Sequence, residues 1–265
     1  MLPYIGGKSR LSKWIIENFP EDYRKMTYVE VFGGGGWVLY KKEPSVVEIY
    51  NDLNETLVTL FKVIRDNFEV FHHQAQWTLH SRQIFEEALR KIREDKFDCD
   101  VEKALAKAIA QVQSFAGEGT SWGYNIHSRD KKTVSVKWMP FIRKLRLINA
   151  RLKNVQIENL DFERLIRKYD RETTLFYIDP PYVSTEYYYN HDKTLFTKDD
   201  HIRLANLLKE IRGKFILSYY KHPLILELYK DYKILFRSTR KSSAGTTKDT
   251  KKPFPEATEM LILNY

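Results

Sequence analysis

Short strand-like runs alternate with helical patterns near both ends of the chain. Runs typical of strands cover residues 27–32, 46–50, 155–160, 174–178, 215–220 and 258–265. Helical spacing of apolar residues covers 11–19, a stretch that begins near Trp37, 163–169 and 197–212. Alternation of strands and helices is typical of βαβ units. The pattern therefore predicts an α/β fold, with a doubly wound, mostly parallel sheet and flanking helices.

Residues 55–149, in the middle of the chain, have a different pattern. Helical spacing covers residues 57–67, 81–95 and 101–115, without intervening strands. Residues 117–125 are rich in glycine and aromatic side chains, and residues 133–138 alternate like an exposed strand. We therefore predict a core formed by residues 1–54 and 150–265, and an inserted subdomain of helices and a hairpin.

The composition favours a globular, soluble and cytoplasmic protein. The chain has 265 residues, of which 43% are hydrophobic, enough for a substantial core. We see no basic and apolar leader before Pro3 and no apolar run of membrane-spanning length. Cys99 is the single cysteine, so neither an internal disulfide nor a multi-thiolate zinc site is expected. We expect no metal site, and predict that His72, His73 and His80 are surface or packing residues.

The net charge of +9 is concentrated in residues 129–153. One acidic residue, Asp130, accompanies nine basic residues there: Arg129, Lys131, Lys132, Lys137, Arg143, Lys144, Arg146, Arg151 and Lys153. Clustered Lys and Arg bind phosphate backbones, and the interleaved Trp138 and Phe141 favour nucleic acid over a solvated charged face. The polar and basic stretch 240–253 is either a plain surface loop or a further DNA contact.

Four consecutive glycines follow the first predicted strand. Residues 33–36 are all glycine, and a helical pattern begins directly after them. Without side chains, a ligand can approach the backbone closely at the start of a helix. The next predicted strand ends in Asn51 and Asp52, and an acidic residue at this place suits the hydroxyls of a ribose. The alternative is a flexible turn.

Asp179, Pro180, Pro181 and Tyr182 follow the apolar run at 174–178, where a buried strand would end. Asp179 and the carbonyl of Pro180 could accept both N–H hydrogens of an exocyclic amine on a nucleobase, which is otherwise a poor nucleophile. Tyr182 offers an aromatic face on which a base flipped out of its duplex could stack. The alternative is a Pro-Pro turn that only ends the strand.

The order of these elements resembles the Dam-type (D12 class) adenine-N6 DNA methyltransferase family over nearly the whole chain. The resemblance implies a Rossmann-like methyltransferase sheet, S-adenosyl-L-methionine as the cofactor, and a catalytic tetrad that begins at Asp179. It implies a catalytic role for Asp179, Pro180 and Tyr182. It also implies that the following residues bind the cofactor: Tyr4, Gly7, Lys8, Glu30, Phe32, Gly33, Gly35, Asp52, Asp161, Phe162 and Asp179. Among these, Asp161 and Phe162 match the pair that contacts the cofactor's adenine.

The resemblance also gives residues 55–149 a function in target recognition. It implies that double-stranded DNA is the partner, and that the motif at residues 123–125 inserts between bases. The expected DNA-binding residues are Tyr124, Asn125, Arg129, Lys131, Lys132 and Lys137. We further expect a monomer or weak dimer, a bacterial, archaeal or phage-infected host cell, and a possible companion restriction endonuclease. Two other functions stay open: an RNA base methyltransferase, or a non-catalytic DNA-binding protein that retains the fold.

Overall fold

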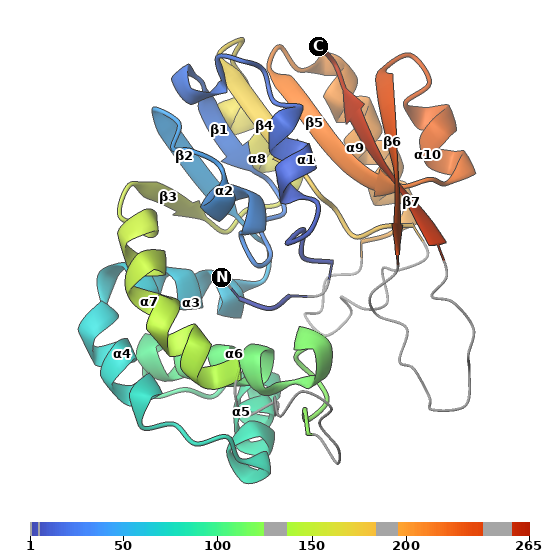
Figure 1. Cartoon of the computed structure of the whole chain (residues 1–265). Helices are drawn as coiled ribbons and strands as arrows, with labels where there is room; N and C mark the ends of the chain where they lie inside the picture. The colour runs from blue at the N-terminus through green and yellow to red at the C-terminus, as the bar shows by residue number, and fades with distance from the viewer. Residues whose placement is uncertain (1, 5, 125–136, 184–195, 241–255) are drawn as a thin grey trace.

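The computed structural model describes residues 2–4, 6–124, 137–183, 196–240 and 256–265 (Figure 1). Within this part of the chain, one seven-stranded sheet has the order β3-β2-β1-β4-β5-β7-β6. The strands are β1 (Thr27–Glu30), β2 (Val47–Asn51), β3 (Val155–Glu158), β4 (Thr174–Ile178), β5 (Lys214–Tyr220), β6 (Lys233–Arg240) and β7 (Glu256–Leu263). Strands β1 to β5 pair in parallel, whereas β7 is antiparallel to both β5 and β6. The predicted α/β class and mostly parallel sheet are confirmed.

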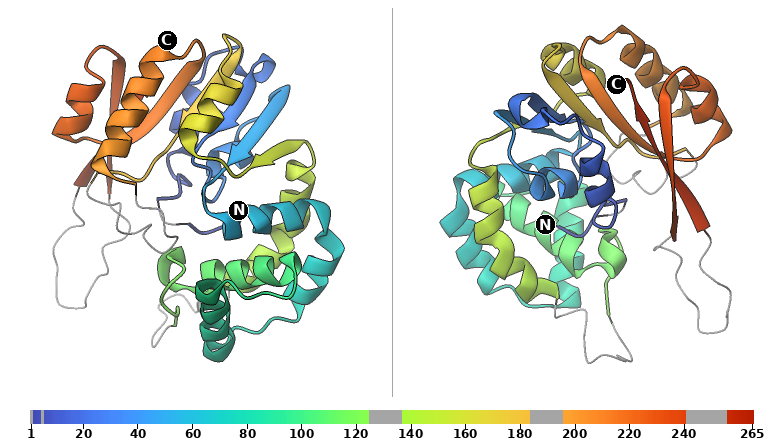
Figure 2. Two further views of the ribbon diagram at one scale, coloured as in Figure 1. Left: turned by 180° about the vertical axis from the view of Figure 1, so that it is seen from behind. Right: turned by 45° about the horizontal axis from the view of Figure 1, so that its top comes forward.

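Two hydrophobic clusters lie on opposite faces of the sheet, because successive side chains of a strand point to opposite faces. In β4, Leu175 and Tyr177 belong to one cluster, and Phe176 and Ile178 belong to the other. Helices α8 (Phe162–Tyr169), α9 (Lys198–Glu210) and α10 (Pro223–Leu228) cover the second face, seen from behind in Figure 2. Helices α1 (Ser12–Glu17) and α2 (Trp37–Lys41) lie on the first face.

A group of helices from the middle of the chain lies below the β1–β3 side of the sheet in Figure 1. These helices are α3 (Glu55–Asp66), α4 (Phe68–Gln76), α5 (Arg82–Glu94), α6 (Asp100–Gln113) and α7 (Trp138–Leu152). Two short 3-10 helices are Tyr23–Lys25 and Phe115–Gly117. Leu57 of α3 and Leu145 of α7 belong to the same hydrophobic cluster as Ile15 and Tyr50. The middle helices and the sheet therefore share one core.

Charged side chains that are largely shielded from water also join α7 to the sheet. Arg151 of α7 donates to both carboxylate oxygens of Glu48 on β2, and the Lys42 ammonium lies 2.5 Å from the same carboxylate. Arg151 also donates to the carbonyl of Leu39 in α2 at 2.9 Å. Since Glu48 is only 2% exposed, these bonds replace the water that its charge would otherwise need.

The hairpin prediction is wrong at its C-terminal end. Residues 125–136 lie outside the described residues, but Trp138, predicted to end an exposed strand, begins α7 and is buried. Its indole nitrogen donates to the carbonyl of Ala75 at 3.0 Å. Helices α4, α7 and α10 and strand β6 were not predicted. Among the described residues, no helix is long and apolar enough to cross a membrane.

Candidate active site

Loops after four neighbouring strands enclose a cavity of about 440 Å³. The glycines at 33–36 follow β1, Asp52 follows β2, Asp161 follows β3, and Asp179 follows β4. Although β1 and β4 are far apart in sequence, they are neighbours, and the strand order reverses between them. Ligands of doubly wound sheets bind outside the carboxyl ends of the strands at this reversal. The cavity therefore lies where the fold favours a ligand.

The glycine loop can adopt its conformation because its residues have no side chains. A Cβ on Gly33 would lie 2.1 Å from the ring of Tyr50, closer than any real contact. Gly34 has a φ of +48°, in the left-handed region that glycine adopts at little cost. The loop therefore keeps its backbone close to Tyr50 and open to the cavity.

Asp52 fixes this loop from the end of the neighbouring strand. Its Oδ2 accepts a hydrogen bond from the amide of Gly34 at 2.8 Å, and its Oδ1 accepts from the amide of Asn54 at 2.9 Å. Asn54 in turn caps α3 by accepting from the amide of Leu57. The carboxylate thus holds the end of β2, the glycine loop and the start of α3 in one arrangement at the cavity wall.

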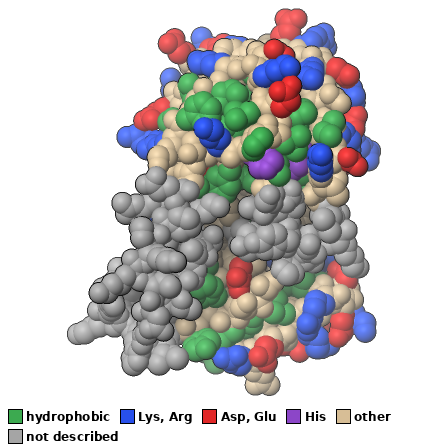
Figure 3. All heavy atoms as spheres, turned by 90° about the vertical axis from the view of Figure 1, so that its right-hand side faces the viewer, with side chains coloured by type: hydrophobic (Ala, Val, Ile, Leu, Met, Phe, Trp, Pro, Cys, Tyr) green, Lys and Arg blue, Asp and Glu red, His purple; other side chains and the backbone are tan. Residues whose placement is uncertain are grey.

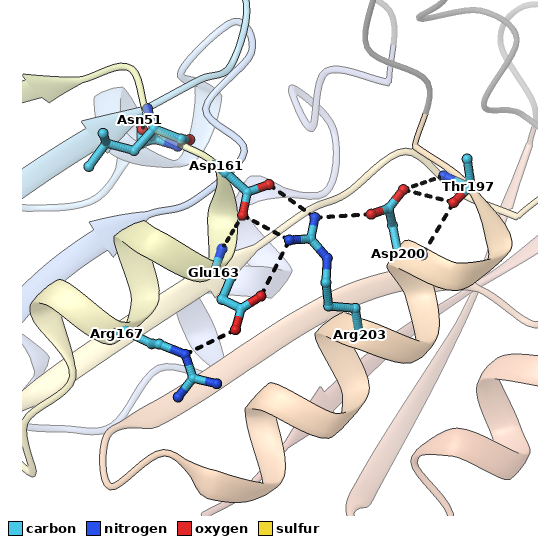
Figure 4. Close-up of polar contacts among 8 residues, drawn as sticks. Asn51, Asp161, Glu163, Arg167, Thr197, Asp200 and Arg203 are labelled. Carbon is cyan, nitrogen blue, oxygen red and sulfur yellow. Dashed lines mark hydrogen bonds and ion pairs between the residues drawn. The ribbon is translucent and has the colours of Figure 1, made fainter.

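Aromatic rings form another part of the wall, beside Asp161. The centroids of Phe32 and Phe162 lie 5.8 Å apart, and Phe196 lies within 5.8 Å of both. Asp161 caps α8 by accepting from the amide of Glu163 at 3.0 Å, and it pairs with Arg203 of α9 (Figure 4). A cluster of aromatic rings therefore lies next to a hydrogen-bond acceptor in the cavity wall, a combination that suits a purine ring.

Lys8 and Asp179 form an ion pair elsewhere in the cavity wall. The Lys8 ammonium lies 2.8 Å from Oδ1 of Asp179, and it also donates to the carbonyl of Gly6. Lys8 is only 7% exposed. Burial raises the pKa of Asp179 above its ordinary value, and the ammonium of Lys8 offsets this only in part by favouring the ionised form. The pair therefore places a carboxyl acceptor beside a cation in a site that is mostly shielded from water.

Tyr182 lies behind Lys8 and faces the last strands of the sheet. The Lys8 ammonium lies over its ring, 4.7 Å from the centroid. The ring contacts Tyr220 at 4.6 Å, and its hydroxyl donates to Glu259 of β7 at 3.0 Å. Burial raises the pKa of Glu259 to about 7. The ring of Tyr182 is therefore held on several sides, and its hydroxyl is bonded to a carboxyl group that titrates near neutral pH.

Glu30, the last residue of β1, is a buried carboxyl at the cavity wall. Its Oε2 accepts from the Tyr28 hydroxyl at 2.7 Å and from the Leu39 amide at 2.8 Å. Burial raises the pKa of Glu30 to about 8, although both hydrogen bonds favour the ionised form. The group is therefore mostly protonated at neutral pH unless a positive charge comes close.

Comparison with known proteins identifies the family. The sequence pattern of the D12 class N6 adenine-specific DNA methyltransferases matches residues 4–242. The chain belongs to this family. The match spans the glycine loop, the cavity and the Asp179 tetrad, so the resemblance expected from the sequence is confirmed.

Three known methyltransferases show partial identity to this chain. The type II methyltransferase M.FokI of Planomicrobium okeanokoites is 28% identical, over 100% of this chain and 42% of that protein. The type II methyltransferase M.CviBI of Paramecium bursaria Chlorella virus NC1A is 24% identical, over 88% of this chain and 86% of that protein. The modification methylase StsI of Streptococcus sanguinis is 24% identical, over 74% of this chain and 30% of that protein. The chain thus spans less than half of two of these relatives.

All eleven residues that the D12 resemblance assigned to the cofactor line this one cavity. They come from the N-terminal loop, the end of β1 and the glycine loop, and the ends of β2, β3 and β4. Of the tetrad, Asp179 and Pro181 line the cavity, Pro180 is buried, and Tyr182 lies behind Lys8.

The expected DNA-binding residues of this D12 member are only partly described. Tyr124 is 59% exposed, with the guanidinium of Arg82 over its ring at 5.6 Å. Lys137 is exposed and precedes α7. The other four, Asn125, Arg129, Lys131 and Lys132, lie outside the described residues, as do residues 241–255.

The basic segment 129–153 is not simply a nucleic-acid surface. Trp138 and Phe141, whose place among the basic residues was taken to favour nucleic acid, are buried in the core. Arg151 bonds to the buried Glu48. Figure 3 shows a different face, on the side of β6 and α10 in Figure 1, where the described Lys and Arg side chains are interspersed with acidic ones. The apolar face of α7 belongs to the core, whereas Arg143, Lys144 and Arg146 on the same helix are exposed, so binding of nucleic acid by this run stays a prediction.

Sequence reasoning missed cavity residues that come from distant elements. Phe196 and Arg203 line the cavity beside Asp161, although about 40 residues separate them from it in sequence. The capping pattern at Thr197 correctly predicted the start of α9, but no local pattern shows which face of α9 meets α8. Outside the cavity, His80 stacks on Trp122 and His72 on Phe68, as expected of packing residues.

Proposed function

We propose that this chain is a site-specific DNA methyltransferase that transfers a methyl group from S-adenosyl-L-methionine to N6 of an adenine flipped out of double-stranded DNA. The observation that carries the proposal is a single cavity, in which Asp179 lies with every residue expected to hold the methyl donor. Membership of the D12 class supports the choice of base and atom.

The cavity suits the methyl donor in size and chemistry. Its volume of about 440 Å³ lies in the usual range for small-ligand sites, roughly 300–1,000 Å³. Phe32 and Phe162 offer an apolar wall to the adenine ring, and Asp52 offers carboxylate oxygens to the ribose hydroxyls. Glu30 offers a hydrogen-bond acceptor to the amino-acid end of the methyl donor. The glycine loop offers this end backbone groups that no side chain covers. S-adenosylmethionine, when bound, supplies a methyl group on a positively charged sulfur.

Asp179 and Pro180 would prepare the target amine. The lone pair of an exocyclic amine is delocalised into its ring, so acceptors on both N–H groups make the nitrogen more nucleophilic. Burial raises the pKa of Asp179, and the ammonium of Lys8 partly offsets this by favouring the ionised form, which is the stronger acceptor. Proline has no N–H, so the carbonyl is the polar backbone group that Pro180 can offer. Direct transfer then depends mainly on position and charge.

Tyr182 would stack on the flipped adenine, as expected for the aromatic residue of the tetrad. Lys8 lies over the ring at 4.7 Å, so stacking on that face requires Lys8 to move. The contacts of Tyr182 with Tyr220 and Glu259 would keep the ring in place while it does.

Residues 55–149 would bind and read the DNA. We assign Tyr124 and Asn125 to base contacts, and Arg129, Lys131, Lys132 and Lys137 to phosphate contacts. Exposure of Tyr124 and Lys137 and the net charge of +9 support this assignment. Two relatives are named type II methyltransferases and a third a modification methylase, so we propose a companion restriction endonuclease. We also propose that the chain acts as a monomer or weak dimer.

Methyl transfer tests the proposal directly. The chain is incubated with methyl-labelled S-adenosylmethionine and mixed-sequence double-stranded DNA, with RNA as a competitor. We expect label at adenine N6 in DNA. Asp179→Asn should lower the rate at least about 100-fold, with donor binding within a few fold, because a neutral amide is a weaker acceptor than a carboxylate and the difference acts mainly in the transition state. The control is Asp199→Asn, at an exposed position of α9. Label in RNA alone, or donor and DNA binding without transfer, would contradict the proposal.

A further inference from the structure

Arg203 of α9 contacts both residues expected at the adenine end of the cavity. Its guanidinium donates to Oδ1 of Asp161 at 3.1 Å and to Oδ2 at 3.0 Å. The same guanidinium lies over the ring of Phe162, 4.1 Å from the centroid. Arg203 also lines the cavity. One side chain therefore contacts both the acceptor and the aromatic ring at the start of α8; Figure 4 shows its bonds to Asp161.

The start of α9 holds Arg203 in this place. Thr197 and Asp200 form a capping box, and Asp200, three residues before Arg203, accepts from its guanidinium at 3.0 Å. A further bond reaches Glu163 at 3.3 Å. Arg203 thus lies among the carboxylates of Asp161, Glu163 and Asp200. Without it, these like charges would repel one another, and Asp161 would lose the bidentate partner that holds its carboxylate plane.

Asp161 keeps acceptor capacity for a ligand. A carboxylate has about four lone-pair sites. Oδ1 receives the Glu163 amide and one Arg203 N–H, whereas Oδ2 receives one Arg203 N–H. The bidentate pairing sets the direction of the remaining lone pair on Oδ2. Lysine offers a point charge and cannot set this plane in the same way.

We propose that Arg203 is a positioning residue for the adenine end of the methyl donor, and that it sets the preference for a purine with a 6-amino group. This inference rests on the proposed function, because it takes S-adenosylmethionine as the ligand. Arg203 acts through Asp161, whose carboxylate accepts from the 6-amino group, and through Phe162, against which the purine ring packs.

Binding measured by calorimetry tests this proposal without DNA or turnover. The ligands are S-adenosylhomocysteine and its analogue that lacks the 6-amino group. Wild-type protein should prefer the first by about tenfold, the effect of one hydrogen bond to a charged group. Arg203→Ala should bind S-adenosylhomocysteine about tenfold more weakly and lose most of this preference. Arg203→Lys should retain the fold and part of the affinity, but little of the preference.

Arg167→Ala is the matched control. Arg167 also pairs with Glu163, at 3.0 Å, but it pairs with Glu210 instead of Asp161. We expect its affinity and preference to match those of the wild type. Unchanged preference in Arg203→Lys and Arg203→Ala would overturn the proposal for Arg203 alone. Absence of S-adenosylhomocysteine and S-adenosylmethionine binding to the wild type would instead overturn the proposed function.

Discussion

Glu30 links ligand binding to a proton. Its pKa of about 8 reflects burial, which the hydrogen bonds from Tyr28 and Leu39 only partly offset. A neighbouring ammonium group would stabilise the carboxylate and lower this pKa. If Glu30 faces the amino group of the methyl donor, as proposed, the carboxyl must lose its proton when the donor binds.

We predict that donor binding strengthens as pH rises toward about 8, by about tenfold per pH unit below this value. The sign follows because the free carboxyl is protonated below its pKa, and binding must release that proton. Calorimetry at neutral pH, in buffers with different ionisation enthalpies, should detect the release of about one proton. Glu30→Gln keeps an acceptor for both of its donors and should bind weakly without this dependence. A pH-independent affinity in the wild type would exclude the linkage.

Glu259 and Tyr182 should act as one unit in catalysis. Since the Tyr182 hydroxyl donates to Glu259, Tyr182→Phe and Glu259→Ala each remove the same bond. We expect each change to lower kcat by about tenfold or more, because a hydrogen bond to a charged group contributes roughly 1.5–3 kcal/mol. Donor affinity should stay within about twofold, since neither residue is among those that line the cavity within the described part of the chain.

The double variant shows whether the two single changes lower kcat through their shared hydrogen bond or through two independent effects. Tyr182→Phe with Glu259→Ala should lose little more kcat than either single change, because residues in one hydrogen-bonded pair are not additive. Losses that multiply in the double variant would show that Glu259 does not act through the ring of Tyr182.

At the scale of elements, the bonds around Glu48 fix α7 and α2 to β2. Burial alone would raise the pKa of Glu48, but Arg151 and Lys42 lower it. We expect Glu48→Ala to lower the free energy of unfolding by about 3–5 kcal/mol, since it leaves two buried cations without their partner. Glu87→Ala is the control, because its pair with Arg90 is exposed to solvent and should contribute little to stability. Denaturant unfolding measures both, and equal effects would refute this function of Glu48.

The elements that the sequence predicts well have strong local patterns. Strand β4 is a continuous apolar run with every residue buried, and α9 begins at a capping box. Helix α7 was not predicted, because its basic residues were interpreted as a nucleic-acid-binding run, although Phe141, Leu145 and Ile148 have helical spacing. Edge strand β6, in which polar residues flank a run of only three apolar ones, gains its structure from pairing with β7. Its pairing, like that of Arg203 with Asp161, depends on contacts between distant segments, which no local pattern encodes.

At the scale of the whole molecule, the N-terminal loop lies between the cavity and the middle helices. On one side, the Tyr4 ring is so close to Gly34 that an added Cβ would lie 3.0 Å from it. On the other side, a Cβ on Gly117, after α6, would lie 2.8 Å from Cβ of Pro3. The loop that carries Lys8 therefore contacts the segment proposed to bind DNA as well as the site proposed to bind the methyl donor.

We predict that Gly117→Ala weakens donor binding several-fold, although Gly117 does not line the cavity. The new methyl group would displace Pro3, and with it Tyr4 and Lys8. Gly119→Ala is a matched control: its φ of +81° resembles the +77° of Gly117, so the backbone strain is similar, but its Cβ would meet only Gln111, at 3.4 Å. Calorimetry measures the affinity of both variants for S-adenosylhomocysteine, and thermal unfolding measures their stability. Together they distinguish displacement of the N-terminal loop from strain in the backbone. Equal affinities at equal stability would show that the N-terminal loop does not couple the two parts of the molecule.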